Sequence, residues 1–135
     1  MRNLVQQLIA EERRAAGNSA EADRASFRVC EKLRRPLSVF AGVGGFRSLL
    51  SRALGLAKTE APLLAGVTIR PDATLQFSPE LEAQLGSEEA ERAAAVLADR
   101  LVGLLVIFIG EALTLRLVHD VWPTTADEDR KFGEK

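Results

Sequence analysis

The feature that most constrains this chain is the stretch from Glu88 to about Val121. It contains no proline and only two glycines, Gly103 and Gly110. Such a stretch predicts one continuous helix, on the order of 50 Å long at 1.5 Å per residue. Between residues 101 and 118 the chain is apolar on nearly every side of this helix, so other segments must surround it. We therefore expect the helix to be the centre of a bundle or an interface.

The same apolar segment raises the alternative of a membrane span. Its 18 residues are close to the minimum for crossing a bilayer, but Glu111 and Arg116 lie within them. Each charge costs about 2.5 to 3.5 kcal/mol near the middle of the bilayer, which offsets most of the apolar contribution. We therefore expect a buried bundle helix rather than a transmembrane span.

Shorter helices are predicted ahead of this stretch. Residues 3–16 have an amphipathic pattern that ends at Gly17, and a second helix runs from a cap at Asn18 to about Arg35. Pro36 lacks a backbone N–H, so we place a break there and start a third helix over residues 37–57. The apolar positions of the three helices are Leu4, Val5, Leu8 and Ile9; Ala22, Ala25 or Ser26, Val29, Cys30 and Leu33; and Phe40, Val43, Phe46 or Arg47, Leu50, Ala53, Leu54 and Ala57.

Three glycines interrupt the third helix, at Gly42, Gly44 and Gly45. Glycine is unfavourable in a helix interior, so either the chain turns here or another backbone packs very closely. In the second case the side of the long helix that carries Gly103 and Gly110 receives this segment. The run also invites comparison with a phosphate loop, but it matches neither GxxxxGK[ST] nor GxGxxG.

The pattern changes to period two between Gly66 and Phe77, which predicts a short hairpin lying on the helices. After it, Ser78 followed by proline is typical of a helix start, and Gly86 followed by Ser87 ends that short helix and caps the next.

These elements predict an all-α fold, a four- to five-helix bundle around one long central helix with a short β-hairpin at residues 67–77. Aromatic residues make up only 5% of the 135 residues, which argues against a sheet-rich fold. We expect a single helical domain over residues 1–122 and a polar, flexible tail over residues 123–135.

Glu111 is the most informative ionisable residue of the sequence. A carboxylate in so apolar a segment must be paired, neutral, or placed at an interface or cavity. Its candidate partners are Arg47 and Arg52 of the preceding helix, or Arg116 of a neighbouring subunit. We predict that Glu111 pairs with an arginine across a helix interface.

The sequence offers no arrangement typical of an enzyme. His119 is the only histidine, and no serine or cysteine is placed by sequence to complete a triad with it. A metal site usually needs several ligands, and there is no cluster of Cys and His. We therefore predict no catalytic, metal or cofactor site, and interpret His119 as a cation at a helix C-terminus. Trp122, just beyond it, is interpreted as a packing anchor.

The charge pattern gives no strong nucleic-acid signal. Residues 1–60 carry 11 basic and 6 acidic groups, net +5, and residues 61–135 carry 7 and 13, net −6, which leaves −1 overall. The arginines of the second helix are mixed with acids and lack interleaved aromatics for base stacking. The single cysteine, Cys30, and an N-terminal region without a continuous apolar core favour a cytoplasmic location.

A chain this short has few other apolar faces with which to cover its long helix. The leading hypothesis is therefore a non-enzymatic interaction module, an oligomerising or adaptor subunit that binds a copy of itself or another protein through that helix. The alternative is a sensor or carrier that holds a small apolar or amphiphilic ligand in the bundle core, with Glu111 or Arg116 orienting its polar end. The candidate interface or buried polar residues are Arg47, Arg52, Leu101, Gly103, Leu105, Phe108, Gly110, Glu111, Arg116 and His119.

Overall fold

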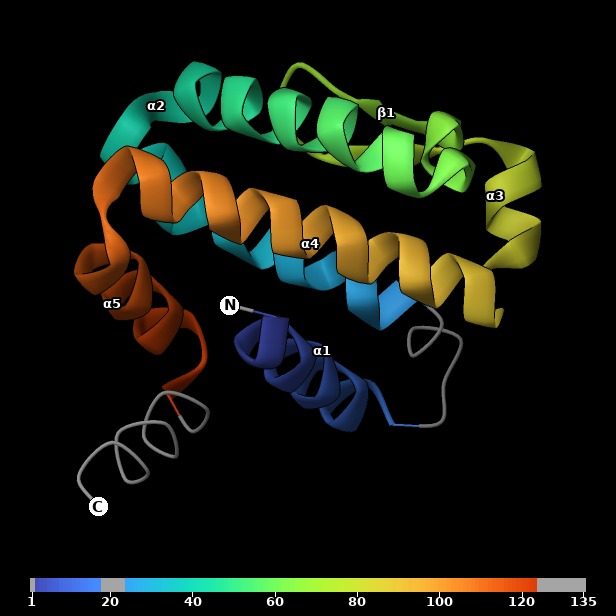
Figure 1. Ribbon diagram of the computed structural model, residues 1–135, viewed down its shortest axis with the longest axis horizontal. Helices are drawn as coiled ribbons and strands as arrows, with labels where there is room; N and C mark the ends of the chain where they lie inside the picture. Colours follow the sequence, from blue (N-terminus) through green and yellow to red (C-terminus); the bar gives the residue numbers. More distant parts are fainter. Residues whose placement is uncertain (1, 18–23, 124–135) are drawn as a thin grey trace.

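The computed structural model describes residues 2–17 and 24–123, which form five α-helices, one 3-10 helix and a two-stranded hairpin (Figure 1). The mainly helical fold with a short hairpin is confirmed. The predicted cap at Asn18, the core position at Ala22 and most of the predicted tail lie outside the described residues. In chain order the elements are α1 (Arg2–Ala16), α2 (Ala25–Glu60), the 3-10 helix η2 (Pro62–Gly66), β1 (Val67–Ile69), β2 (Leu75–Phe77), α3 (Pro79–Gln84), α4 (Glu88–Ile109) and α5 (Glu111–Val121).

The ends of the helices follow the signals in the sequence. Gly17 ends α1 with φ +67° and donates its N–H to the carbonyl of Arg13 at 3.1 Å. The hydroxyl of Ser78 accepts the N–H of Leu81 at 3.2 Å, which caps α3, and the hydroxyl of Ser87 caps α4 in the same way. Local sequence therefore determines where these helices begin and end.

The predicted hairpin is also present. Val67 pairs with Phe77 and Ile69 with Leu75 in an antiparallel register. In the turn, Thr74 donates its N–H and hydroxyl to Asp72 Oδ1, and these hydrogen bonds hold the pKa of Asp72 below its ordinary value. Phe77 packs its ring against Phe27 of α2, with centroids 4.8 Å apart, so two short strands are held by the helices beneath them.

The predicted break at Pro36 is wrong, because α2 continues through it. Leu33 and Leu37, on either side of the proline, are both buried in the core, and their packing holds the helix together despite the missing hydrogen bond. The chain turns at Gly42 instead, with φ +81° and ψ +158°. This backbone conformation is essentially limited to glycine, so the glycine and not the proline makes the corner.

The predicted single helix over residues 88–121 is also wrong, because the structure has a break where we expected none. Gly110 adopts φ +90° and ψ +159°, which separates α4 from α5 and turns the chain back on itself. The predicted close packing of glycines is not formed either, since a side chain at Gly44 or Gly103 would meet no atom within 4 Å. Turns, not close helix contacts, account for Gly42 and Gly110.

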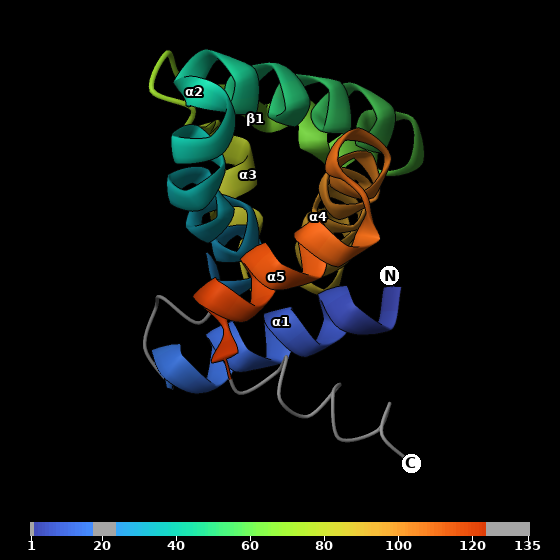
Figure 2. The same cartoon turned by 90° about the vertical axis from the view of Figure 1, so that its left-hand side faces the viewer.

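The core lies mainly between α2 and α4, which share the most extensive contact in the fold. Seen in Figures 1 and 2, α4 lies beside both halves of α2, with α1 and α5 below. Both glycine corners are therefore at the same end of the molecule. Its largest fully buried side chains are Val5, Leu8, Phe27, Leu33, Leu37, Phe46, Leu50, Leu64, Leu81, Leu97, Leu101 and Leu105.

One buried carboxylate joins three helices and was missed by the sequence analysis. Glu12 of α1 is only 3% exposed, with Lys32 Nζ of α2 at 2.7 Å. Trp122, directly after α5, donates its indole N–H to the same Glu12 oxygen at 2.9 Å. The signal was present, because Glu12 lies one turn after Leu8 on the apolar side of α1. The interpretation of Trp122 as an anchor agrees with its burial.

Candidate interaction surface

Glu111, the residue on which the sequence analysis placed most weight, is exposed. It is the first residue of α5, and the turn at Gly110 carries it out of the apolar environment that a straight helix would have given it. Arg47 is engaged elsewhere, donating to the carbonyls of Arg70 at 3.1 Å and Ile69 at 3.4 Å. The predicted internal pair with Arg47 or Arg52 is therefore absent from residues 2–17 and 24–123. The pair with Arg116 of a neighbouring subunit stays a prediction.

The apolar end of α4 divides between core and surface. Leu101 and Leu105 are completely buried within the chain, so they are core residues and not the interface residues that we expected. Phe108, by contrast, is 60% exposed and its neighbour Ile107 is 82% exposed. These two side chains lie in the last turn of α4, shortly before the turn at Gly110.

The corner of α2 presents the same kind of surface. Val39 is 85% exposed and Phe40 is 53% exposed, and both come just before the turn at Gly42. The two corners share a local sequence pattern of a β-branched residue, Phe, one further residue and Gly, at residues 39–42 and 107–110. Similar sequences with similar glycine dihedrals therefore expose similar side chains in both places.

A groove connects the two corners. It is lined by Phe40, Ala41, Gly45, Ser48, Leu49 and Arg52 of α2 and by Phe108 of α4, and its volume is about 530 Å³. We call the surface made by Val39, Phe40, Val43, Ile107 and Phe108 around this groove the end face. In Figure 2, which looks at this end, the α2 corner is at the upper left, the α4 to α5 corner is at the right, and α5 runs leftward below them.

The charged residues near the end face are of both signs. Arg52 lines the groove itself, and Glu111 and Arg116 are exposed on α5. Within the described part of the chain, none of these three side chains takes part in an ion pair. The end face therefore has an apolar centre, and the charged side chains near it form no ion pair among residues 2–17 and 24–123.

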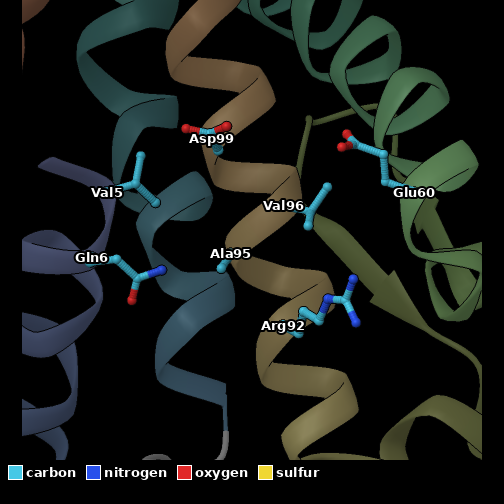
Figure 3. Close-up of a pocket in the computed structure, with 7 residues that line it drawn as sticks. All are labelled: Val5, Gln6, Glu60, Arg92, Ala95, Val96 and Asp99. Atoms are coloured by element: carbon cyan, nitrogen blue, oxygen red, sulfur yellow. The ribbon is translucent and has the colours of Figure 1, made fainter. Parts of the chain in front are cut away.

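A second, polar pocket of about 270 Å³ lies between α1, α4 and the end of α2 (Figure 3). Arg92 and Asp99 of α4 border it, and Glu60 at the far side is hydrogen-bonded to Arg100 Nε at 2.7 Å. Its other lining residues are Val5, Gln6, Ala95 and Val96. The lining contains no serine, cysteine or histidine, and its two carboxylates are Glu60, which is paired with Arg100, and Asp99.

The chain has a single cysteine, Cys30, and a single histidine, His119. Burial raises the pKa of the Cys30 thiol to about 12, so it stays protonated at neutral pH and is a poor nucleophile. His119 lies in the last turn of α5. In residues 2–17 and 24–123 no three His, Cys, Asp or Glu side chains are grouped to hold a metal ion.

Comparison with family models, curated proteins and solved structures found no match. None of the helices in the described ranges has the length and apolarity needed to cross a bilayer. The most exposed large apolar side chains of the described residues lie on the end face.

Proposed function

We propose that this protein is a non-enzymatic interaction module that docks on a protein partner through the end face. The observation that carries the proposal is the gathering of five large apolar side chains at one end, with Val39 and Ile107 more than 80% exposed. Exposed apolar residues that are scattered singly are normal, whereas here Phe40 and Phe108 line one groove and the other three lie at the same two corners, as at an interaction site.

The composition of the end face fits protein recognition. Phe40 and Phe108 line the groove, and aromatic side chains are enriched at the centres of protein interfaces. The charges of Arg52, Glu111 and Arg116 lie around this apolar centre, as in interfaces that have an apolar core and a polar rim. We further propose a cytoplasmic location, because the single cysteine of the chain has no partner for an internal disulfide.

A carrier function is the second candidate, and the groove favours it. A volume of about 530 Å³ lies within the range of small-molecule sites, roughly 300 to 1,000 Å³. Of the two residues expected to orient a ligand, Glu111 and Arg116, neither lines the groove, which weakens this alternative. Native mass spectrometry of the purified protein discriminates, because a carrier retains a bound small molecule of defined mass.

Site-specific photo-crosslinking tests the docking function without assuming the partner. A photoreactive amino acid replaces Phe108 on the end face or, as a control, the exposed Ala83 of α3. Crosslinking is run on the purified protein and in cells that express it. The proposal expects a discrete protein adduct, with this chain itself or with another protein, from position 108 and not from position 83. Absence of a protein adduct from position 108 in both settings contradicts it.

A further inference from the structure

We infer that the partner of the end face is a second copy of this chain, related to the first by a two-fold axis; this inference rests on the proposed docking function. The exposed positions of α5 are Glu111, Ala112, Leu115, Arg116 and, one turn further on, Asp120; the first four carry the inference. When two α5 helices lie antiparallel about a two-fold axis, a residue nearer the start of one helix lies at the level of a residue nearer the end of the other. The two residue numbers of every such pair add up to the same value. One register places Glu111 opposite Arg116 and Ala112 opposite Leu115.

This register is self-complementary in charge and in size. An acid meets a base, a small side chain meets a large one, and the symmetry makes each contact twice. Both charged groups are free of ion pairs within residues 2–17 and 24–123, so pairing them with a second copy disrupts nothing described in the monomer. The dimer therefore provides the pair between Glu111 and Arg116 of a neighbouring subunit that the sequence suggested.

The same axis also covers the two corners. In Figure 2 they lie toward opposite sides of the end, with α5 running from one side toward the other. A rotation that makes the two α5 helices antiparallel exchanges these sides, and so brings the α2 corner of each copy toward the α4 to α5 corner of the other. Val39 and Phe40 of one copy then approach Ile107 and Phe108 of its partner. Apolar side chains that are exposed in the monomer become buried in the dimer.

A second copy fits this surface better than an anionic membrane does. Arg52 and Arg116 would be attracted to anionic headgroups, but Glu111 lies directly at the α4 to α5 corner and would be desolvated beside them. In the dimer each Glu111 forms an ion pair with Arg116 of the other copy. Because the patch is small, the interface lies near the lower limit of stable ones, about 1,200 Å² in total, and we expect dissociation in the micromolar range.

Charge reversal tests the two-fold register. Glu111→Arg alone places two arginines opposite each other twice, and Arg116→Glu alone places two glutamates opposite each other twice. Each variant is expected to dissociate about tenfold or more readily than the wild type in sedimentation velocity. Mixing the two variants restores every pair in the heterodimer, and combining both changes in one chain restores every pair in the homodimer. Restoration in both cases shows that residues 111 and 116 face each other across the contact, and a species that stops at two copies in sedimentation velocity shows that the contact is isologous.

Matched controls separate the register from general effects of charge. Glu89→Arg changes the first turn of α4 as Glu111→Arg changes that of α5, and Arg92→Glu reverses an exposed arginine of α4. For the apolar contacts, Ile107→Lys is compared with Leu56→Lys, because Leu56 is exposed at 42% but lies outside the end face. We expect Ile107→Lys to weaken the dimer and the three controls to leave it unchanged, with circular dichroism showing that all variants are folded.

A wild-type chain that stays monomeric across the micromolar range overturns the inference, and so does a mixture of the two charge variants that stays monomeric. If position 108 nevertheless crosslinks to a different protein, the docking function stands and only the identity of the partner is wrong. Flotation of the wild type with anionic vesicles, lost in Ile107→Lys and not in Leu56→Lys, would overturn the second-copy inference in favour of a lipid surface.

Discussion

Two regions of this molecule place a side chain in an environment that does not match its polarity, and they resolve the mismatch differently. At the seam between α1, α2 and α5, the carboxylate of Glu12 is buried, but Lys32 and Trp122 of the same chain answer it. At the end face, Phe108 and Ile107 are exposed and no described segment covers them. The first region contributes to stability, and the second is free to contribute to association.

The sharpest test of this distinction uses two residues one turn apart on α4. Leu105 is fully buried and Phe108 is 60% exposed. Leu105→Ala should lower the free energy of unfolding by roughly 2 to 5 kcal/mol through the cavity that it leaves. Phe108→Ala should change the stability of the monomer by less than about 0.5 kcal/mol. Urea denaturation at a concentration that favours the monomer measures both, and equal losses would break the division between core and end face.

The seam predicts a smaller effect. Glu12→Ala removes the acceptor of the Trp122 N–H and the partner of Lys32, and should lower the free energy of unfolding by about 1 to 3 kcal/mol. We expect the lower half of this range, because the ammonium of Lys32 can still reach solvent. Glu11→Ala, which removes only a surface pair with Arg14, is the control. Similar denaturation midpoints for the two variants would mean that the buried carboxylate does not stabilise the seam.

Substituting alanine for two glycines of this region should change the free energy of unfolding in opposite directions. Gly110→Ala forces a side chain into a conformation with φ +90°, which should cost about 1 to 3 kcal/mol. Gly103→Ala, in the interior of α4 with open space around it, should stabilise the chain by about 0.5 to 1 kcal/mol. Thermal unfolding by circular dichroism reads both. Stabilisation by Gly110→Ala would show that the corner is not held in solution.

An effect that depends on pH concerns the buried thiol, which has no counterpart on the end face. Folding raises the pKa of Cys30 from 9.0 to about 12, so the folded state holds the proton more tightly than the unfolded state. This contribution is fully present below pH 9 and is lost as pH rises toward 12. Between pH 9 and pH 10 the wild type should lose about 1 kcal/mol more than Cys30→Ala does. Parallel pH profiles of the two proteins in urea denaturation would contradict it.

Local patterns predicted a large part of the fold. The apolar spacing of Leu4, Val5, Leu8 and Ile9 identified the buried side of α1, and Ser78 and Ser87 cap the helices that they were expected to cap. Alternation around the turn at residues 70–73 identified the hairpin. These features depend on residues within a few positions of one another, and so the sequence contains the necessary information.

The candidate site was harder to predict, because it depends on which side chains remain uncovered. Phe108 was named as an interface residue together with Leu101 and Leu105, although only Phe108 is exposed. Val39 and Ile107, the most exposed large apolar residues described, were not singled out. The pairing of a β-branched residue and Phe shortly before glycine, present in both segments, was the available signal.

The sequence by itself determined the helical class, the hairpin and the helix caps. Tertiary structure alone decided that α2 bends at Gly42 and not at Pro36, and that α4 ends at Gly110. A glycine can adopt a helical or a left-handed conformation at similar cost, and a proline can be carried within a helix when buried neighbours hold both sides. The choice therefore depends on long-range packing of α2 against α4, and that packing brings the two corners to one end of the molecule.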